Sequence, residues 1–286
     1  MITISVIIPA LNEEIRIAEC LSAIVNGTEK PCEIIVADGS STDRTVEIAK
    51  SFGATVVNNE KVHAASGRNF GAAHASGDIL AFIDADCKPA IDWVESIRLA
   101  FESEDIDGIR GRIEPIESDN IYEIFWGNVW LKEVMKFDEK PFYVSARMLT
   151  QALITANCAY RRSLFNKLGG FSDWFANNAE DVDFAYRAFN SGAKLKYVPS
   201  VRVWAHSPTT MKGIKKKSFR DGISSSKLQK VYGESLHCDS AIYKMLFKNI
   251  IPAIKGDKNS QTMFFELLWH LFGKYYGSFK VGTINL

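Results

Sequence analysis

Residues 77–87, GDILAFIDADC, carry the clearest structural signal in the sequence. The apolar run at 79–83 does not alternate with polar residues, which is typical of a strand buried on both faces. Two aspartates, Asp84 and Asp86, follow this run directly. In open parallel sheets, ligands bind outside the carboxyl ends of the strands, so these carboxylates mark a candidate site.

Two earlier segments show the same arrangement. Residues 3–8 (TISVII) and 33–37 (EIIVA) are β-branched apolar runs, and polar residues follow them at 9–14 and 38–40. Apolar residues at helical spacing separate the runs. Strands that alternate with helices predict an α/β fold, in which helices flank a mostly parallel sheet.

Two later segments extend this pattern. Residues 180–190 carry apolar side chains at i, i+3, i+4 and i+7, which predicts an amphipathic helix that ends near Gly192. Residues 195–205 predict a strand, but Pro199 lies near its middle. Because proline has no backbone N–H, we expect an edge strand or two short strands at this position.

The composition is that of an ordinary globular protein. The chain has 286 residues, of which 47% are hydrophobic and 24% are charged, and these values exclude intrinsic disorder. Five scattered cysteines without a C-x-x-C pair predict reduced thiols and no zinc site. No apolar run reaches the roughly 20 residues of a membrane span, and no basic segment precedes the first run as in a secretory signal. We therefore expect a cytoplasmic protein.

Charge is distributed unevenly along the chain. Residues 209–286 contain 13 Lys or Arg and 5 Asp or Glu, a balance of +8, which leaves a balance of −8 for residues 1–208. A break of this kind predicts a domain boundary. We expect an α/β domain over residues 1–206 and a basic, aromatic-rich helical region over residues 207–286.

Two acidic groups could carry chemistry, and each has a plainer alternative. Asp84 and Asp86 could hold Mg²⁺ together with substrate phosphates, or could belong to a solvated turn. Glu180, Asp181 and Asp183 could supply a general base, or could only complement the dipole of the helix that they open.

Two single residues are equally open to interpretation. A guanidinium fork suits phosphate, so Arg68 could contact a nucleotide, but it could also be a surface residue. His206 follows the last predicted strand and could be a metal ligand or a structural histidine. Neither G-x-G-x-x-G nor G-x-x-x-x-G-K-[ST] occurs, so we expect no Rossmann dinucleotide site and no P-loop.

Five motifs, in this order, resemble the family 2 glycosyltransferases of GT-A fold. They are VIIPALNEE at 6–14, IIVADGSSTDRT at 34–45, GRNFGAAHASGDILAFIDADC at 67–87, TANCAYRRSLFNKLGGF at 155–171 and AEDVDFAYRAFNSG at 179–192. The resemblance covers residues 3–206, and the ordered set is more specific than any one motif.

The resemblance implies an enzyme that transfers a sugar from a nucleotide-sugar donor, most commonly a UDP-sugar, with inversion at the anomeric carbon. It implies Mn²⁺ or Mg²⁺ at the D-x-D pair, with Asp86 as the direct ligand and His206 completing the metal shell. It makes Asp181 the catalytic base and Glu180 a neighbour of the acceptor. The expected contacts of the donor nucleotide are Pro9, Ala10, Glu13, Asp38, Arg68 and Asp84.

The Q-x-x-R-W motif of processive polysaccharide synthases is absent, as are their transmembrane helices, which favours the addition of one or a few sugars. Two alternatives remain open. One is a non-catalytic nucleotide-sugar or glycan-binding module on the same fold, which would be expected to lack the base or the D-x-D pair. The other is a sugar nucleotidyltransferase, which would be expected to open with a Gly-rich basic loop in place of PALNEE.

The basic C-terminal region needs an explanation of its own. Lys212, Lys215, Lys216 and Arg220 follow helical spacing, and residues 263–279 suit a helix that lies in a membrane interface. We expect peripheral contact with the anionic inner face of the cell membrane, and a glycan or lipid-linked acceptor. The alternative is a helix pair packed on the catalytic domain or on a second copy, which would give a homodimer. No nucleic-acid partner is expected, because no base-stacking or groove-reading motif accompanies the charge.

Overall fold

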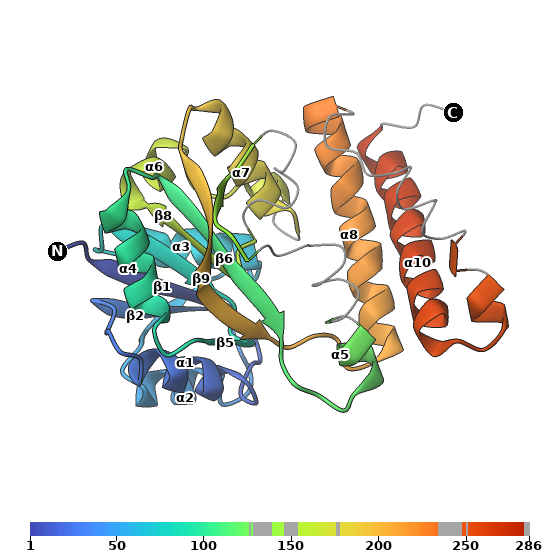
Figure 1. Cartoon of the computed structure of the whole chain (residues 1–286), viewed down its shortest axis with the longest axis horizontal. Coiled ribbons are helices and arrows are strands. Elements are labelled where there is room, and N and C mark those ends of the chain that lie inside the picture. Colours follow the sequence, from blue (N-terminus) through green and yellow to red (C-terminus); the bar gives the residue numbers. More distant parts are fainter. Residues whose placement is uncertain are drawn as a thin grey trace. The chain divides into compact units, whose positions relative to one another are not determined.

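The structure is a computed structural model of the chain (Figure 1). It describes residues 1–125, 127, 139–145, 154–175, 178–233, 248–249 and 251–282. The chain divides into two compact units. The first comprises residues 1–116, 135–176 and 180–206, and the second comprises residues 117–134, 177–179 and 207–286.

A nine-stranded sheet forms the centre of the first unit. Its strands lie in the order β3-β2-β1-β4-β8-β6-β9-β5, and β7 also pairs with β9. In chain order they are β1 (Ile4–Ala10), β2 (Glu33–Asp38), β3 (Thr55–Asn58), β4 (Ile79–Ile83), β5 (Cys87–Pro89), β6 (Gly108–Pro115), β7 (Phe142–Tyr143), β8 (Asn157–Arg161) and β9 (Leu195–Ala205).

Most strands of this sheet run in the same direction. β1 is parallel to β2 and to β4, and β3 is parallel to β2. β8 is antiparallel to both β4 and β6, so β6 has the direction of β4, and β9 is parallel to β6. The predicted α/β fold with a mostly parallel sheet is confirmed.

Helices of the first unit follow the strands as the alternating pattern predicts. They are α1 (Ile17–Val25), α2 (Thr45–Ser51), α3 (Ala64–His74), α4 (Trp93–Ser103), α6 (Arg162–Lys167), the 3-10 helix η3 (Asp173–Phe175) and α7 (Glu180–Asn190). α3 packs on β1 and β2. Two glycines permit this approach, because a Cβ at Gly71 would lie 2.6 Å from Cγ2 of Ile7 and one at Gly67 would lie 3.4 Å from Cβ of Pro9.

β9 contains Pro199 and yet lies inside the sheet, between β6 and β5, so the expected edge position is wrong. The pairing with β6 shifts between Gly111 and Arg112, because Gly111 pairs with Val198 and Arg112 with Arg202. Pro199 lies in the part of β9 that this bulge leaves unpaired with β6. A proline is tolerated there, because no ladder hydrogen bond needs its missing N–H.

The side chain of Asn157 satisfies the backbone at this bulge. Its Nδ2 donates to the carbonyl oxygens of Arg112 and Val201, both at 2.9 Å, and its Oδ1 accepts from Nε1 of Trp93 at 2.9 Å. Asn157 is fully buried. The amide therefore replaces ladder hydrogen bonds that the shifted register cannot make.

We expect Gly111→Ala to destabilise the sheet at the bulge. A Cβ at Gly111 would overlap the carbonyl oxygen of Val201 and Nδ2 of Asn157, and neither the backbone nor the bonded amide can move aside. Overpacking of this kind costs about 1–3 kcal/mol. Chemical denaturation should show the loss. Gly39→Ala, whose Cβ would meet its neighbours at 3.5 Å or more, is the matched control, and equal stabilities of the two variants would contradict the explanation.

The second unit is helical where the structure describes it. It contains α5 (Ile121–Phe125), α8 (Met211–Tyr232) and α10 (Lys258–Val281), and the last two pack along each other (Figure 1). A small core joins α5 to both long helices through Phe125, Ile214, Met263 and Leu267.

Two expectations from composition bear on the structure. The thiols of Cys20, Cys32, Cys87 and Cys158 are free, as their scattered positions predict, and Cys238 lies outside the described residues. Within the described ranges, no helix combines the length and the apolar character that a membrane crossing requires.

Candidate active site

The carboxyl ends of β1, β2 and β4 meet at one edge of the sheet. Ala10 at the end of β1 is in register with Asp38 at the end of β2, and Asp84 directly follows β4. The backbones of neighbouring strands lie about 4.8 Å apart, so the Cα atoms of Asp38 and Asp84, on either side of β1, are about 10 Å apart. The structure thus brings two predicted site residues to a common edge.

Two loops at this edge hold each other in place. The Asn12 side chain accepts a hydrogen bond from the N–H of Thr42 at 2.8 Å, and the Asn12 N–H donates to Oγ of Ser41 at 2.9 Å. Asn12 and Ser40 have φ values of 55° and 68°, in the left-handed region. Strained backbone of this kind concentrates at ligand-binding and catalytic sites.

Asp38 presents a buried acceptor at the end of β2. Its side chain is 6% exposed, and Oδ2 accepts a hydrogen bond from the N–H of Ser41 at 3.0 Å. Oδ1 is buried and has no partner among the described residues. A buried acceptor without a partner is costly, so this atom can take an N–H or O–H group of a ligand.

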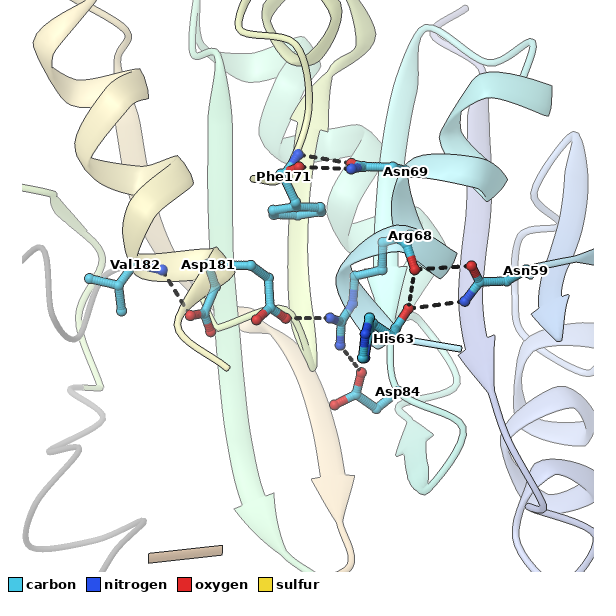
Figure 2. Close-up of polar contacts among 10 residues, drawn as sticks. Asn59, His63, Arg68, Asn69, Asp84, Phe171, Asp181 and Val182 are labelled. Atoms are coloured by element: carbon cyan, nitrogen blue, oxygen red, sulfur yellow. Dashed lines mark hydrogen bonds and ion pairs between the residues drawn. The ribbon is translucent and has the colours of Figure 1, made fainter. Parts of the chain in front are cut away.

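Arg68 joins two acidic segments that lie far apart in the sequence. Its guanidinium donates to Oε1 of Glu180 at 2.6 Å and to Oδ1 of Asp84 at 2.5 Å (Figure 2). Arg68 is only 3% exposed, so the interpretation as a surface residue is wrong. The buried cation ties the start of α7 to the end of β4.

The electrostatics of this cluster follow from its burial. Burial alone would lower the pKa of Arg68, but Asp84 and Glu180 outweigh that effect and raise it. Burial raises the pKa of Glu180 to about 7, with Asp181 and Asp84 adding to the rise and Arg68 opposing it. Arg68 therefore keeps its charge and stabilises the ionised form of Glu180.

Asp181 lies next to this cluster at the first turn of α7 (Figure 2). Its side chain is half-buried, and Oδ1 accepts a hydrogen bond from the N–H of Val182 at 2.8 Å. Burial raises the pKa of Asp181, whereas the N–H groups of Val182 and Thr155 and the charge of Arg68 oppose the rise. A carboxylate in this position can accept a proton from a ligand hydroxyl.

Aromatic packing and one ion pair fix the position of α7. The ring of Phe184 lies 4.7 Å from that of Tyr160 and 5.2 Å from that of Phe165, between ring centroids. Asp183 is bound to Arg187 at 2.7 Å, an i, i+4 pair, and is 3% exposed. Asp183 therefore has a structural role, which leaves Glu180 and Asp181 for the site.

Asp86 and His206 meet although 120 positions separate them in the sequence. β5 pairs with β9, so Cys87 lies opposite Ala205, and the N–H of His206 donates to the carbonyl of Asp86 at 3.2 Å. Nε2 of His206 also lies 3.5 Å from Oε2 of Glu19. Burial raises the pKa of Asp86 to about 6, Asp84 adds to the rise, and Arg16 and His206 oppose it.

Glu13 belongs to the same acidic group. Burial, together with the charges of Asp86 and Asp84, raises the pKa of Glu13 to about 7, and the charge of Arg16 opposes the rise. Pro9 and Ala10 precede Glu13 at the end of β1, where the carbonyl of Ala10 accepts a hydrogen bond from the N–H of Gly39 at 2.8 Å. These three predicted nucleotide contacts therefore lie at the edge that carries Asp38 and Asp84.

Three features of the site were not predicted from the sequence. Nη1 of Arg16 lies 3.8 Å from Oδ2 of Asp86, so Arg16 adds a cation to the acidic group. Asn69 exchanges two hydrogen bonds with the backbone of Phe171, at 2.7 and 2.8 Å, which anchors α3 beside Arg68 (Figure 2). Nδ2 of Asn59 donates a hydrogen bond to the carbonyl oxygen of His63, the residue directly before α3. Asn69 lies inside a quoted motif and Arg16 lies close to one, so these two could have drawn attention, whereas no sequence signal pointed to Asn59.

Comparisons with known proteins agree on one family. The sequence profile of glycosyl transferase family 2 matches residues 5–169. Glycosyltransferase AglE of Haloferax volcanii is 28% identical over 232 residues, which cover 77% of this chain and 71% of the relative. The probable glycosyltransferase YdaM of Bacillus subtilis is 29% identical over 227 residues, which cover 73% of this chain and 52% of the relative. The matched region thus spans about half of YdaM.

Solved structures share the fold. Mannosyltransferase PcManGT from Pyrobaculum calidifontis, in complex with GDP-Man and Mn²⁺, has a TM-score of 0.67 at 18% identity, over 98% of this chain and 88% of that chain. Glucosyl-3-phosphoglycerate synthase from Mycobacterium tuberculosis, in complex with Mn²⁺, UDP and glucosyl-3-phosphoglycerate, has a TM-score of 0.57 at 21% identity, over 80% and 79%. The GT-A fold that the motifs imply is confirmed.

Proposed function

This chain belongs to glycosyl transferase family 2, and we propose that it moves a sugar from a nucleoside-diphosphate sugar to an acceptor hydroxyl in one inverting displacement. The observation that carries the proposal is the link from Glu180, beside Asp181, through buried Arg68 to Asp84. This link holds a half-buried carboxylate and a ligand-binding sheet edge in one cluster.

Asp181 is the general base of the proposed reaction. It takes the proton of the acceptor hydroxyl while that oxygen attacks the anomeric carbon, and the bond to the nucleoside diphosphate breaks. The N–H of Val182 and the N-terminus of α7 favour the ionised carboxylate that this step requires. We assign Glu180, which is nearly buried, to holding Arg68, with the acceptor next to Asp181.

The donor nucleotide is proposed to bind at the ends of β1 and β2. Asp38 supports this proposal, because its buried Oδ1 can accept a hydrogen bond from a nucleoside N–H or O–H group. Pro9, Ala10 and Glu13 line the same edge, and Arg68 and Asp84 lie on the diphosphate side. We favour a UDP-sugar. The mycobacterial synthase was solved with UDP and the mannosyltransferase with GDP-Man, so both nucleotides belong in the test.

Asp86 is the proposed protein ligand of a divalent cation, Mn²⁺ or Mg²⁺, with His206 beside it. Such a cation, when bound, stabilises the charge on the leaving diphosphate. A carboxylate suits Mn²⁺ and Mg²⁺, and a neutral imidazole is a common metal ligand. In the described part of the chain, no three His, Cys, Asp or Glu side chains form a group that could hold a metal ion. A cation held by Asp86 and His206 would need further oxygen ligands, which the phosphates of the donor can supply.

The acceptor hydroxyl is proposed to belong to a glycan or a lipid-linked sugar at the inner face of the membrane. Support for this extension is the basic and aromatic character of α8 and α10. A turnover assay with Mn²⁺ and a panel of UDP- and GDP-sugars tests the proposed reaction. Release of nucleoside diphosphate is expected. In a parallel assay with a sugar 1-phosphate and UTP or GTP, release of pyrophosphate would indicate a nucleotidyltransferase. Binding of nucleotide sugars without turnover in either assay would indicate a binding module.

We expect Mn²⁺ and UDP to stabilise the protein together more than the sum of their separate effects. A ligand at about 100 times its dissociation constant adds about 2.7 kcal/mol to the free energy of unfolding. Thermal shift should show this gain, and EDTA should remove most of it. Asp86→Asn should lose the part that depends on Mn²⁺, whereas Asp105→Asn, at an exposed site, should retain it. Full turnover in excess EDTA would contradict the metal assignment.

A further inference from the structure

Helix α10 carries aromatic side chains on its outer face, whereas two of its charged side chains are buried on its inner face. Tyr275 is 62% exposed and Phe279 is 74% exposed, whereas Glu266 is fully buried and Lys274 is 9% exposed. We define the aromatic face by its five exposed rings: Phe265, Phe272, Tyr275, Tyr276 and Phe279. If the outer face of α10 met only water, we would expect charged and polar side chains on that face and the aromatic side chains on the inner face.

Close packing between α8 and α10 explains why the rings point outward. A Cβ at Gly222 of α8 would overlap the carbonyl oxygen of His270, and a Cβ at Gly273 would overlap that of Phe219. Oγ of Ser218 donates to Glu266 at 3.3 Å inside the same contact. Where the backbones touch through small residues, no ring fits directly between the helices. Rings meet at the side of this contact, where Phe219 of α8 lies 5.6 Å from Tyr276 between ring centroids.

Basic side chains surround the aromatic face. Nζ of Lys215 on α8 lies 4.8 Å from the ring centroid of Phe265, and Nζ of Lys280 lies 5.1 Å from that of Tyr276. The two helices contain ten Lys or Arg and only two carboxylates, Asp221 and the buried Glu266. Lys215 and Lys280 therefore place positive charge beside the rings, on two helices that are strongly basic.

We propose that the aromatic face of α10 docks on a bilayer surface that contains anionic phospholipids. Exposed rings of this number are unfavourable in water and mark an interaction site. Tyrosine rings favour the boundary between headgroups and acyl chains, and lysines favour an anionic surface. An anionic bilayer surface therefore matches the rings in polarity and the neighbouring lysines in charge. This inference does not depend on the sugar-transfer reaction.

Flotation with vesicles tests the proposal on the full chain. The protein should float with vesicles of phosphatidylcholine and phosphatidylglycerol, float far less with phosphatidylcholine alone, and dissociate at 0.5 M NaCl. The Phe272→Ser/Phe279→Ser variant should bind at least tenfold more weakly, because each ring contributes buried apolar area. Each basic residue near the surface is worth about fivefold, so Lys215→Gln/Lys280→Gln, which changes the two lysines beside the rings, should lose about 25-fold.

Matched controls separate docking from general effects of charge and polarity. Lys30→Gln/Lys50→Gln removes the same charge from the first unit, and Leu99→Ser changes an exposed apolar residue of α4. Both should float like the unaltered protein, and all variants should keep their melting temperature and their nucleotide-sugar turnover.

Three results would overturn the proposal. They are equal flotation with neutral and anionic vesicles, no flotation with either, and a concentration-dependent dimer that Phe272→Ser/Phe279→Ser abolishes without any vesicle binding. The last result would assign the aromatic face to a second copy of the chain. Turnover with a soluble acceptor but no flotation would leave the proposed reaction standing and remove only the membrane contact.

Discussion

Asp181→Asn is expected to lower the rate of sugar transfer by about 10²- to 10⁴-fold, which is the usual contribution of a general base. The amide is nearly the same size as the carboxylate and can still accept the hydrogen bond from the N–H of Val182. It cannot take a proton from the acceptor hydroxyl. Donor binding, measured by calorimetry with UDP and Mn²⁺, should therefore be retained.

Two neighbouring carboxylates serve as controls for this prediction. Asp183→Asn alters the pair with Arg187 and should mainly lower stability. Glu180→Gln weakens the hold on Arg68 and should affect donor binding as well as turnover. If Asp181→Asn stays near the unaltered rate while Glu180→Gln or Asp183→Asn abolishes transfer, the base has been misassigned.

The pH profile gives a second readout of the same assignment. Burial raises the pKa of Asp181, so the acidic limb of kcat/KM should lie above the ordinary range of an aspartate. Turnover should rise with pH through this limb, because only the ionised carboxylate is a base. The residual activity of Asp181→Asn should show no such acidic limb.

Local sequence patterns were sufficient for the elements that build the sheet edge. Ile79–Ile83 is a continuous apolar run with no polar alternation, and it forms the buried β4 with Asp84 directly after it. The acidic start and apolar stripe of α7 were equally clear. In both cases the signal lies in consecutive residues and depends on no distant partner.

Features that depend on distant partners could not be read in this way. Arg68 could be interpreted as a surface residue, because the neighbouring sequence does not show that α3 packs closely on the sheet at Gly71 and that its guanidinium is buried. Pro199 suggested an edge strand, because the sequence does not show that Asn157 repairs the bulge from another strand. Asp86 and His206 meet only through the pairing of β5 with β9, so the motifs alone linked them.

The aromatic segment of α10 shows a third kind of limit. Its helical period is evident from the sequence, but apolar periodicity normally identifies the inner face of a helix. Met263, Leu267 and Leu271 do lie on the inner face, but the large rings do not, because close contact with α8 at Gly273 and Gly277 leaves room only for small side chains there. Period and composition therefore predicted the helix without predicting its orientation.

Arg68→Met should lower the free energy of unfolding by about 3–5 kcal/mol, because it removes one partner of a buried ion cluster and leaves carboxylates without their cation. Arg44→Met is the matched control. Its pair with Glu47 is largely exposed, so the expected loss is about 0–1 kcal/mol. Chemical denaturation at several pH values measures both.

The loss in Arg68→Met should grow with pH, and the sign follows from Glu180. Burial already raises the pKa of Glu180 to about 7, and removing Arg68 takes away the charge that opposes this rise. An acid whose folded pKa exceeds its unfolded value keeps its contribution below the unfolded pKa and loses it as the pH rises through the folded one. The deficit should therefore be smallest near pH 5 and largest near pH 8. The double variant Arg68→Met/Glu180→Gln should lose most of this pH dependence, because the glutamine cannot ionise; a deficit that stays constant from pH 5 to 8 would mean that Arg68 acts through packing alone.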